Sequence, residues 1–305
     1  MKKRLLAAVC ALTLCVSFAP VYAETDDGGI SNAPIAENFE LETYRGVPVG
    51  GQLTATDPED EPVTFRLTTE PMKGTVELQE NGSFVYTPNE GKRGRDYFGY
   101  KAVDSSGNES QEATVIIRIR KQQTAVTYSD MTGRPEAYAA TLLAEKGVCV
   151  GQCIGGNYLF SPDDEMKRGE FLALCMELTG EPLLEGVMTT GFGDDAEIPA
   201  WSKSYVSTAV MNGSVQGYSN GTAVVFDAQR GITHAEAAVL LDRIVRTTPA
   251  SAAAADDAVP AWASQAVANL TACSVYPAGL ESGAALTRAE CAQMLAGAME
   301  VLARR

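Results

Sequence analysis

The chain has 305 residues, of which 45% are hydrophobic and 21% charged, and its formal net charge at pH 7 is −15. This length accommodates two ordinary domains. Nucleic-acid binding relies on a basic face that neutralises phosphates, so a chain this acidic is expected to bind no nucleic acid. An anionic ligand would have to be held by a few well-placed cations.

The first 23 residues have the features of a secretory signal peptide. Lys2, Lys3 and Arg4 precede an apolar run that begins at Leu5, and small residues allow cleavage after Ala23. Removal of this segment takes away three positive charges and changes the net charge from −15 to −18. No other apolar run is long enough to span a bilayer. The mature protein is therefore expected to be secreted and soluble, with an acidic tether at 24–32 and no transmembrane segment.

Residues 33–120 read as a β domain. The runs VTFRLTTE, GTVELQ and ATVIIRIR alternate apolar and polar residues, as half-buried strands do. Turn signals such as DPEDEP and DSSGNES separate these runs. Strands at a spacing of roughly ten residues, with no helical window between them, predict an antiparallel β-sandwich.

The segments LTATDPEDEPVTFRL, NGSFVYTPN and DYFGYKAVD occur in an order that resembles bacterial cadherin-like, immunoglobulin-like repeats of surface proteins. The resemblance implies a spacer or adhesion module without catalytic activity. Members of this family often bind calcium, and acidic side chains in loops supply the hard oxygen donors that Ca²⁺ prefers. The matching positions are Glu37, Asp57, Glu59, Asp60 and Asp104. The alternative is that these residues form a solvated acidic turn.

After a linker at 121–126, helical periodicity dominates and landmarks recur at one offset. Three pairs are each separated by 66 residues: Gly147 and Gly213, Phe160 and Phe226, Arg168 and His234. A third copy aligns Trp262 with Trp201 and Arg288 with His234, and its loop is shorter and lacks the Phe. A shared offset is the mark of an internal repeat. The predicted repeats span 127–182, 190–247 and, in shortened form, 253–303.

Each copy has a polar tetrad that ends in Glu and precedes an apolar helix. Thr233 to Glu236 and Thr287 to Glu290 have the spacing of a capping box, in which each side chain bonds the other residue's backbone amide. In the first copy Lys167 replaces the Thr. The next residue is a cation at the positive end of the helix dipole, where it is mildly unfavourable. This position therefore favours a role in ligand binding.

The strings FSPDDEMKRGE, FDAQRGITHAE and LTRAE resemble the corresponding part of S-layer homology domains. The fold class is then an N-terminal all-β immunoglobulin-like sandwich followed by an all-α bundle of three S-layer homology repeats. The resemblance implies a pseudo-threefold bundle whose grooves hold an anionic, often pyruvylated, cell-wall polysaccharide. The residues assigned to these grooves by analogy are Arg168, Arg288, His234, Trp201, Trp262, Gly151 and Gly217.

Simple chemistry agrees with this assignment and also offers alternatives. A guanidinium is a planar fork suited to a carboxylate, and amides at a helix N-terminus attract anions. The arginines could instead form surface ion pairs, and the tryptophans could belong to the core. His234, beside a helix N-terminus, is expected to be mostly neutral at pH 7 and to bind weakly. A His234→Arg substitution would then strengthen binding in the second groove.

Five of the seven cysteines remain after the signal peptide is removed. An odd number leaves at least one thiol free or paired between molecules. A zinc site made of Cys149, Cys153 and Cys175 lacks an evident fourth ligand. Small buried thiols are the favoured interpretation.

These patterns favour a non-enzymatic protein of the cell wall or cell surface, associated with an S-layer. Its partners would be a cell-wall glycopolymer and an unidentified ligand of the β domain, with calcium as the one candidate cofactor. The alternatives are an S-layer lattice component and a wall-polysaccharide hydrolase, which would need paired carboxylates. The pairs present are Asp163/Asp164, Asp194/Asp195 and Asp256/Asp257. They lie at turn-like positions, and the chain has one His and no G-x-S-x-G motif.

Overall fold

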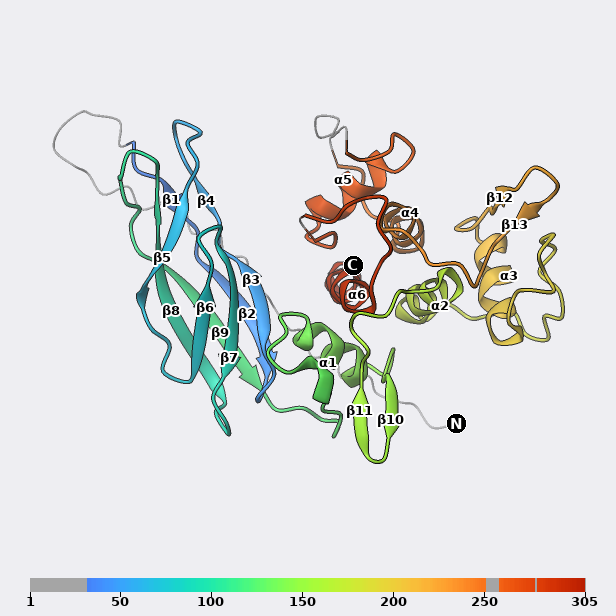
Figure 1. The fold of residues 1–305 in the computed structure, drawn as a ribbon, viewed down its shortest axis with the longest axis horizontal. Coiled ribbons are helices and arrows are strands. Elements are labelled where there is room, and N and C mark those ends of the chain that lie inside the picture. Colours follow the sequence, from blue (N-terminus) through green and yellow to red (C-terminus); the bar gives the residue numbers. More distant parts are fainter. Residues whose placement is uncertain (1–31, 251–257, 278, 305) are drawn as a thin grey trace. The chain divides into compact units, whose positions relative to one another are not determined.

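The structure is a computed structural model that describes residues 32–250, 258–277 and 279–304 (Figure 1). The predicted signal peptide, most of the tether, and Asp256 and Asp257 lie outside these residues. The chain divides into two compact units between Lys121 and Gln122. In the described part of the chain, no helix has the length and apolar character needed to cross a membrane.

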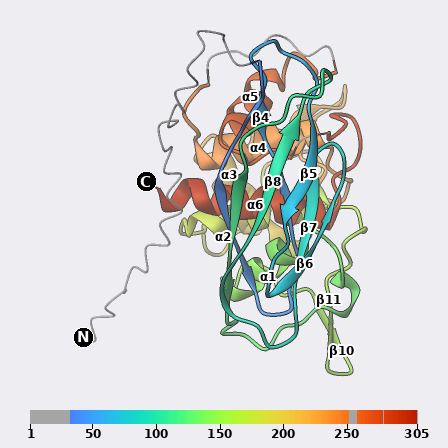
Figure 2. The same ribbon diagram turned by 90° about the vertical axis from the view of Figure 1, so that its left-hand side faces the viewer.

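The first unit consists of strands in two main sheets (Figures 1 and 2). One sheet has the order β2-β9-β8-β5, the other has the order β3-β7-β6, and β1 pairs with β4. The strands are β1 Ile35–Ala36, β2 Phe39–Tyr44, β3 Val49–Gln52, β4 Ala55–Thr56, β5 Thr64–Thr69, β6 Gly74–Leu78, β7 Ser83–Pro88, β8 Gly94–Val103 and β9 Ala113–Arg120.

Alternating burial shows why these segments form a two-layered structure. Every second residue of β9 is buried, as the apolar/polar alternation of ATVIIRIR predicts. The rings of Phe84 on β7 and Phe98 on β8 meet edge to face with centroids 5.2 Å apart, so the two sheets share one core. The strand-rich, sandwich-like prediction is confirmed. One detail differs: β2 pairs with β9 in parallel, and side-chain alternation carries no information about strand direction.

The second unit contains three successive pairs of helices. The elements are η1 Ser129–Met131, α1 Ala137–Glu145, β10 Gln152–Ile154, β11 Asn157–Leu159, α2 Arg168–Thr179, η2 Ala200–Ser202, α3 Lys203–Met211, β12 Tyr218–Ser219, β13 Val224–Val225, α4 His234–Val245, α5 Ser264–Ala272 and α6 Arg288–Ala303. The hairpins β10-β11 and β12-β13 correct the all-α prediction. They form because glycines and polar residues, such as Gly155 and Gly156, turn the chain tightly. In the described residues between α5 and α6, no hairpin is present.

The three helix pairs are joined in a closed cycle. Helix α2 packs on α3, α4 on α5, and α6 returns to α1. Before the second helix of each pair, the chain makes one backbone hydrogen bond to the next strap of the cycle. The Met166 amide donates to the Leu286 carbonyl (2.8 Å), Leu286 to Ile232 (2.9 Å) and Ile232 to Met166 (3.0 Å). All three side chains are buried, so the cycle closes around an apolar centre with approximate threefold symmetry.

Candidate functional site

The first amides of α2, α4 and α6 bond to carbonyl groups of another helix pair. At α2, the Arg168 amide donates to the Arg230 carbonyl and the Gly169 amide to Ala228, both at 2.9 Å. The equivalent bonds are His234 to Ala284, Ala235 to Ser282, Arg288 to Asp164 and Ala289 to Pro162. The prediction that these helix N-termini add anion affinity is therefore wrong, because their amides already have acceptors.

The predicted capping boxes are present at two of the helix starts. The Thr233 amide donates to Glu236 Oε2 (3.1 Å), and the Thr287 amide donates to Glu290 Oε2 (2.8 Å). Each threonine hydroxyl in turn accepts from the backbone amide of its glutamate. At α2, Glu170 still accepts from the Lys167 amide, but an ammonium group cannot accept in return. The tetrad therefore has a structural purpose that requires no ligand.

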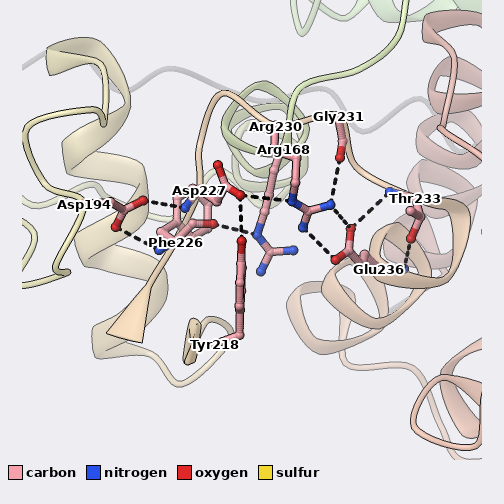
Figure 3. A network of polar contacts seen from close by, with 9 residues as sticks. All are labelled: Arg168, Asp194, Tyr218, Phe226, Asp227, Arg230, Gly231, Thr233 and Glu236. Atoms are coloured by element: carbon pink, nitrogen blue, oxygen red, sulfur yellow. Dashed lines mark hydrogen bonds and ion pairs between the residues drawn. The ribbon is translucent and has the colours of Figure 1, made fainter. Parts of the chain in front are cut away.

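Arg168 is held in place by a phenylalanine of the following helix pair. Its Nε donates to the Phe226 carbonyl at 3.1 Å, and its guanidinium carbon lies 5.1 Å from the Phe226 ring centroid. Burial lowers the pKa of Arg168, although the charge of Glu236 opposes this effect. In the part of the chain described here, the terminal nitrogens of Arg168 have no protein acceptor (Figure 3). The fork is thus fixed at its base and free at its tip.

Arg288 has the same arrangement against the first helix pair. Its Nε donates to the Phe160 carbonyl at 2.8 Å, and its guanidinium carbon lies 5.2 Å from that ring's centroid. Its Nη2 also approaches the Cys149 sulfur at 3.7 Å. The 66-residue offset between Phe160 and Phe226 therefore marks two supports of the same kind.

Two acidic side chains hold these phenylalanine segments. Asp194 accepts the amides of Phe226 (3.0 Å) and Asp227 (2.7 Å). Asp130 accepts those of Phe160 and Ser161 in the same manner. The Asp194 carboxylate, which the hydrolase alternative would use, is thus occupied by backbone amides.

The first cavity is named the Arg168 groove and has a volume of about 240 Å³. It is lined by Arg168, Ser214, Val215, Gln216, Gly217, Tyr218, Glu236, Val239, Leu240, Arg243 and Trp262. Gly217 has φ +70°, and a Cβ there would lie 2.5 Å from a Phe192 ring carbon. A glycine is required at this position by the fold itself. The groove brings together three of the predicted binding residues.

The second cavity is named the Arg288 groove and has a volume of about 630 Å³. It is lined by Cys149, Val150, Gly151, Gln152, Phe160, Ser161, Asp164, Glu165, Lys167, Glu170 and Arg288. Gly151 has φ +69°, and a Cβ would collide with the Leu159 carbonyl oxygen. This groove therefore contains Arg288 and Gly151 from the predicted set.

Both tryptophans are exposed, so the alternative that they belong to the core is wrong. Trp201 is 53% and Trp262 61% accessible. Trp262 lines the Arg168 groove, whereas Trp201 is not among the residues that line either groove and packs on Tyr205 with centroids 6.4 Å apart. An exposed indole gives a flat apolar face that a sugar ring can cover.

His234 does not face either groove. Its side chain is 4% accessible, with Nδ1 2.8 Å from the Glu281 carbonyl oxygen and Nε2 3.1 Å from Glu290 Oε2. Both partners are acceptors, so the two hydrogen bonds form together only on the imidazolium. The expectation of a mostly neutral, ligand-facing histidine is therefore wrong. Imidazole is shorter than the arginine side chain, and it is buried between α4 and the third helix pair.

Burial acts to raise the pKa of Glu290, but hydrogen bonds from the Thr287 amide, His234 and the Thr287 hydroxyl outweigh it. The pKa of this carboxyl is held below its usual range. The carboxylate is thus charged at neutral pH and complements the imidazolium.

Arg230 is a residue that sequence reasoning missed. Its Nη1 and Nη2 bond both carboxylate oxygens of Glu236 at 3.1 and 2.7 Å, and its Nε donates to Asp227 at 3.2 Å (Figure 3). Its guanidinium carbon lies 5.8 Å from the Tyr218 ring centroid. The only signal in the sequence is its position three residues before the capping threonine.

The acidic residues of the first unit mostly order their own turns. Asp57 Oδ1 accepts the amides of Glu59 (2.9 Å) and Glu61 (3.0 Å). Asp104 accepts both nitrogens of Asn108, and Glu37 accepts the Thr54 hydroxyl. Within the described ranges, no group of three or more His, Cys, Asp or Glu side chains is arranged to hold a metal ion. Calcium binding by this unit, with Asp60 among its ligands, stays a prediction.

All five cysteines of the described chain are free thiols. Cys175 and Cys291 are buried, Cys149 is half-buried, and Cys153 is exposed on β10. Burial raises the pKa of the Cys175 thiol well above its usual value. Cys149, Cys153 and Cys175 therefore do not form the zinc site considered from the sequence.

Two family models match the chain. Residues 31–121 match the bacterial cadherin-like domain, and residues 191–238 match the S-layer homology domain. The chain therefore contains one domain of each kind, as the resemblances predicted. The second match covers the α3/α4 pair, so the presence of two further repeats stays a prediction. No curated protein matches the chain.

Several solved structures share a low similarity over about a third of the chain. An endo-fucoidan hydrolase of glycoside hydrolase family 107 is 17% identical over 30% of this chain and 14% of its own, with TM-score 0.24. A mutant of the SrpA adhesin from Streptococcus sanguinis is 14% identical over 33% and 67%, with TM-score 0.24. Fibronectin(III)-like modules of Clostridium thermocellum CbhA are 16% identical over 30% and 50%, with TM-score 0.22. The chain spans 19% and 14% of the first two structures of this group.

Proposed function

We propose that this chain is a non-enzymatic cell-surface protein that binds an anionic, pyruvylated cell-wall polysaccharide through the second unit. The S-layer homology match supports cell-wall anchoring, and the cadherin-like match supports a first unit that acts as a spacer or adhesion module. Such a protein would be secreted and would be retained at the wall without a covalent bond.

The observation that carries this proposal is the state of Arg168 and Arg288. Both guanidinium groups bond a phenylalanine carbonyl through Nε and lie against that residue's ring. A guanidinium held in this way loses little conformational entropy when it binds a planar carboxylate. Since both grooves open beside these forks, a carboxylate on a sugar would find a prepared partner.

The walls of the Arg168 groove suit a carbohydrate. Trp262 offers an exposed aromatic face, while Ser214 and Gln216 offer hydrogen-bonding groups. Sugars bind by this combination of flat apolar surface and directed polar contacts. Gly217 lets the backbone come close to a ligand on that wall.

The disposition of carboxylates supports a binding role over glycoside hydrolysis. Hydrolysis uses two carboxyl groups on either side of the scissile bond. In the Arg168 groove the single acidic lining residue is Glu236, and it is ion-paired with Arg230. Release of labelled sugar from purified wall material by the protein would contradict a purely binding role.

The test is co-sedimentation of the mature protein with purified cell-wall sacculi. The wild-type protein is expected to sediment with intact sacculi and to remain in solution with sacculi whose pyruvyl groups have been removed by mild acid. The Arg168→Ala/Arg288→Ala double variant is expected to lose sedimentation. Arg304→Ala is the matched control, because it removes one exposed arginine at the end of α6.

Retention by depyruvylated sacculi as strong as by intact ones would contradict recognition of the acid group. Self-association would favour the lattice alternative. Sedimentation velocity of the mature protein with and without calcium separates that alternative, since anchoring alone predicts the same monomeric species under both conditions.

A further inference from the structure

In each groove a capping glutamate lies near the arginine that is meant for the ligand. Glu236 lines the Arg168 groove, and Glu170 lines the Arg288 groove. A carboxylate that pairs with the guanidinium would compete directly with a carboxylate on the glycan. The fate of this glutamate therefore decides whether an arginine is available.

In the Arg168 groove, Glu236 is already engaged (Figure 3). Both of its oxygens accept from Arg230, at 2.7 and 3.1 Å, and Oε2 also accepts the Thr233 amide at 3.1 Å. Burial acts to raise the pKa of Glu236, but its hydrogen bonds with Arg230 and Thr233 outweigh this and hold the pKa below its usual range. The side chain is thus charged, doubly bonded and turned away from ligand exchange.

Arg230 is itself fixed on three sides. Nη1 also donates to the Gly231 carbonyl at 3.0 Å, and Nε donates to Asp227 at 3.2 Å. Asp227 in turn accepts the Tyr218 hydroxyl at 2.6 Å. This network spans the wall of the groove and leaves the tip of Arg168 outside it.

The Arg288 groove lacks this device. The residue 66 positions before Arg230 is Asp164, which is an acid where the other groove has a base. Glu170 and Glu165 make no ion pair with any cation of the described chain within 4.0 Å. Its wall combines three acids with Lys167 and Arg288, whereas that of the Arg168 groove combines Arg168 and Arg243 with one neutralised glutamate.

We propose that the Arg168 groove is the site for the carboxylate of the glycan, and that Arg230 is a positioning residue that keeps Arg168 free by holding Glu236. The Arg288 groove, with its acidic wall, accommodates uncharged stretches of the same polymer. This division of roles rests on the proposed function and adds a ligand class for each groove. Without Arg230, Glu236 turns to Arg168 and occupies it.

The probe is a methyl glycoside of an N-acetylhexosamine that carries a 4,6-pyruvate ketal, with the pyruvyl methyl ester as its uncharged control. Calorimetric titration of the mature protein is expected to show binding of the acid and none of the ester. Arg168→Ala abolishes this binding, and Arg230→Gln weakens it by about tenfold, the factor that corresponds to the loss of one charge-assisted contact. Arg288→Ala and the control Arg304→Ala retain the wild-type affinity.

A second substitution separates positioning from a structural role. Glu236→Gln preserves the capping box, since glutamine also bonds the cap amide, but it removes the competing charge. The Arg230→Gln/Glu236→Gln variant is therefore expected to regain affinity to within about threefold of wild type. A merely structural Arg230 would not be rescued, because the double variant lacks all of its ion pairs.

The converse substitution transfers the device to the other groove. In an Arg168→Ala background, Asp164→Arg is expected to create weak binding of the acid probe in the Arg288 groove. The backbone bond from the Arg288 amide to the Asp164 carbonyl does not depend on the side chain. Circular dichroism of each variant verifies that the helices remain.

The outcomes distinguish the two proposals. Unchanged affinity of Arg230→Gln, failure of the rescue in a folded double variant, or loss of binding in Arg288→Ala in place of Arg168→Ala would overturn the division of roles. Sedimentation with intact sacculi without binding of the ketal probe would overturn it while anchoring stands. Failure to bind both the sacculi and the probe would refute the proposed function as well.

Discussion

The Arg168 and Arg288 grooves have the same frame and opposite wall charges. In both, an aspartate bonds two loop amides, a buried phenylalanine carries the guanidinium, and a glycine at positive φ forms the wall. They differ at the position of Arg230, which is Asp164 in the first helix pair. The comparison teaches that a repeat preserves its packing residues for folding, while single charge changes decide which groove can hold an anion.

The largest expected effect tests the shared frame. Phe226→Ala and Phe160→Ala should each lower the free energy of unfolding by about 3–5 kcal/mol, because both side chains are fully buried. Denaturant unfolding followed by tryptophan fluorescence reports on the second unit alone, since both tryptophans of the chain lie there. Met188→Ala, at a side chain 82% exposed, is the control. A cost below 1 kcal/mol at one phenylalanine would mean that the two frames are not equivalent.

The glycine of the groove wall provides a second test of the frame. Gly217→Ala forces φ +70° on an alanine and places its Cβ 2.7 Å from the Val225 carbonyl oxygen, so a loss of about 2–4 kcal/mol is expected. Gly213→Ala has φ +81° but meets no atom within 4 Å, and should cost only about 1 kcal/mol. Equal costs in the same unfolding assay would show that close packing does not constrain the wall.

His234→Arg extends the comparison to the third helix pair. The buried site holds an imidazolium between Glu281 and Glu290, so a longer side chain should destabilise the protein by about 1–3 kcal/mol. No gain in affinity for the ketal probe is expected, which reverses the expectation from sequence. A tighter-binding, equally stable variant would show that a third groove can open. His234→Gln is the control for loss of charge without added length.

The smallest effect is a dependence of stability on pH. The pKa values of Glu236 and Glu290 are lowered in the folded protein, so their contribution is present above the unfolded pKa of about 4.3 and is lost as pH falls through the folded values. Glu290→Gln should therefore flatten the acid limb of a plot of unfolding free energy against pH. Glu300→Gln, at an exposed ion pair, is the control. Parallel acid limbs in wild type and Glu290→Gln would contradict the assigned interactions.

Much of the frame could be predicted from sequence, because it depends on local rules. Strand alternation, the capping boxes of Thr233 and Thr287, and the offset of the phenylalanines are all visible in the chain. The contacts that close the cycle could not be predicted. The amide of Arg168 finds the carbonyl of Arg230, and a pairing between distant loops has no signature in either segment.

The functional residues divide in the same way. Arg168, Arg288 and the glycines were found because they occupy repeated positions. Arg230 was missed because its importance arises only when Glu236 folds back on it, and His234 was misjudged because burial depends on the third helix pair. Electrostatic partners in three dimensions, more than residue type, decide which cation is free.

The most direct test of the central claim is a crystal structure of the mature protein with the pyruvate-ketal probe. The expected result is one carboxylate bound to the terminal nitrogens of Arg168, with Arg230 still bonded to both oxygens of Glu236. Occupancy of the Arg288 groove by the carboxylate, or a Glu236 side chain paired with Arg168, would contradict the claim.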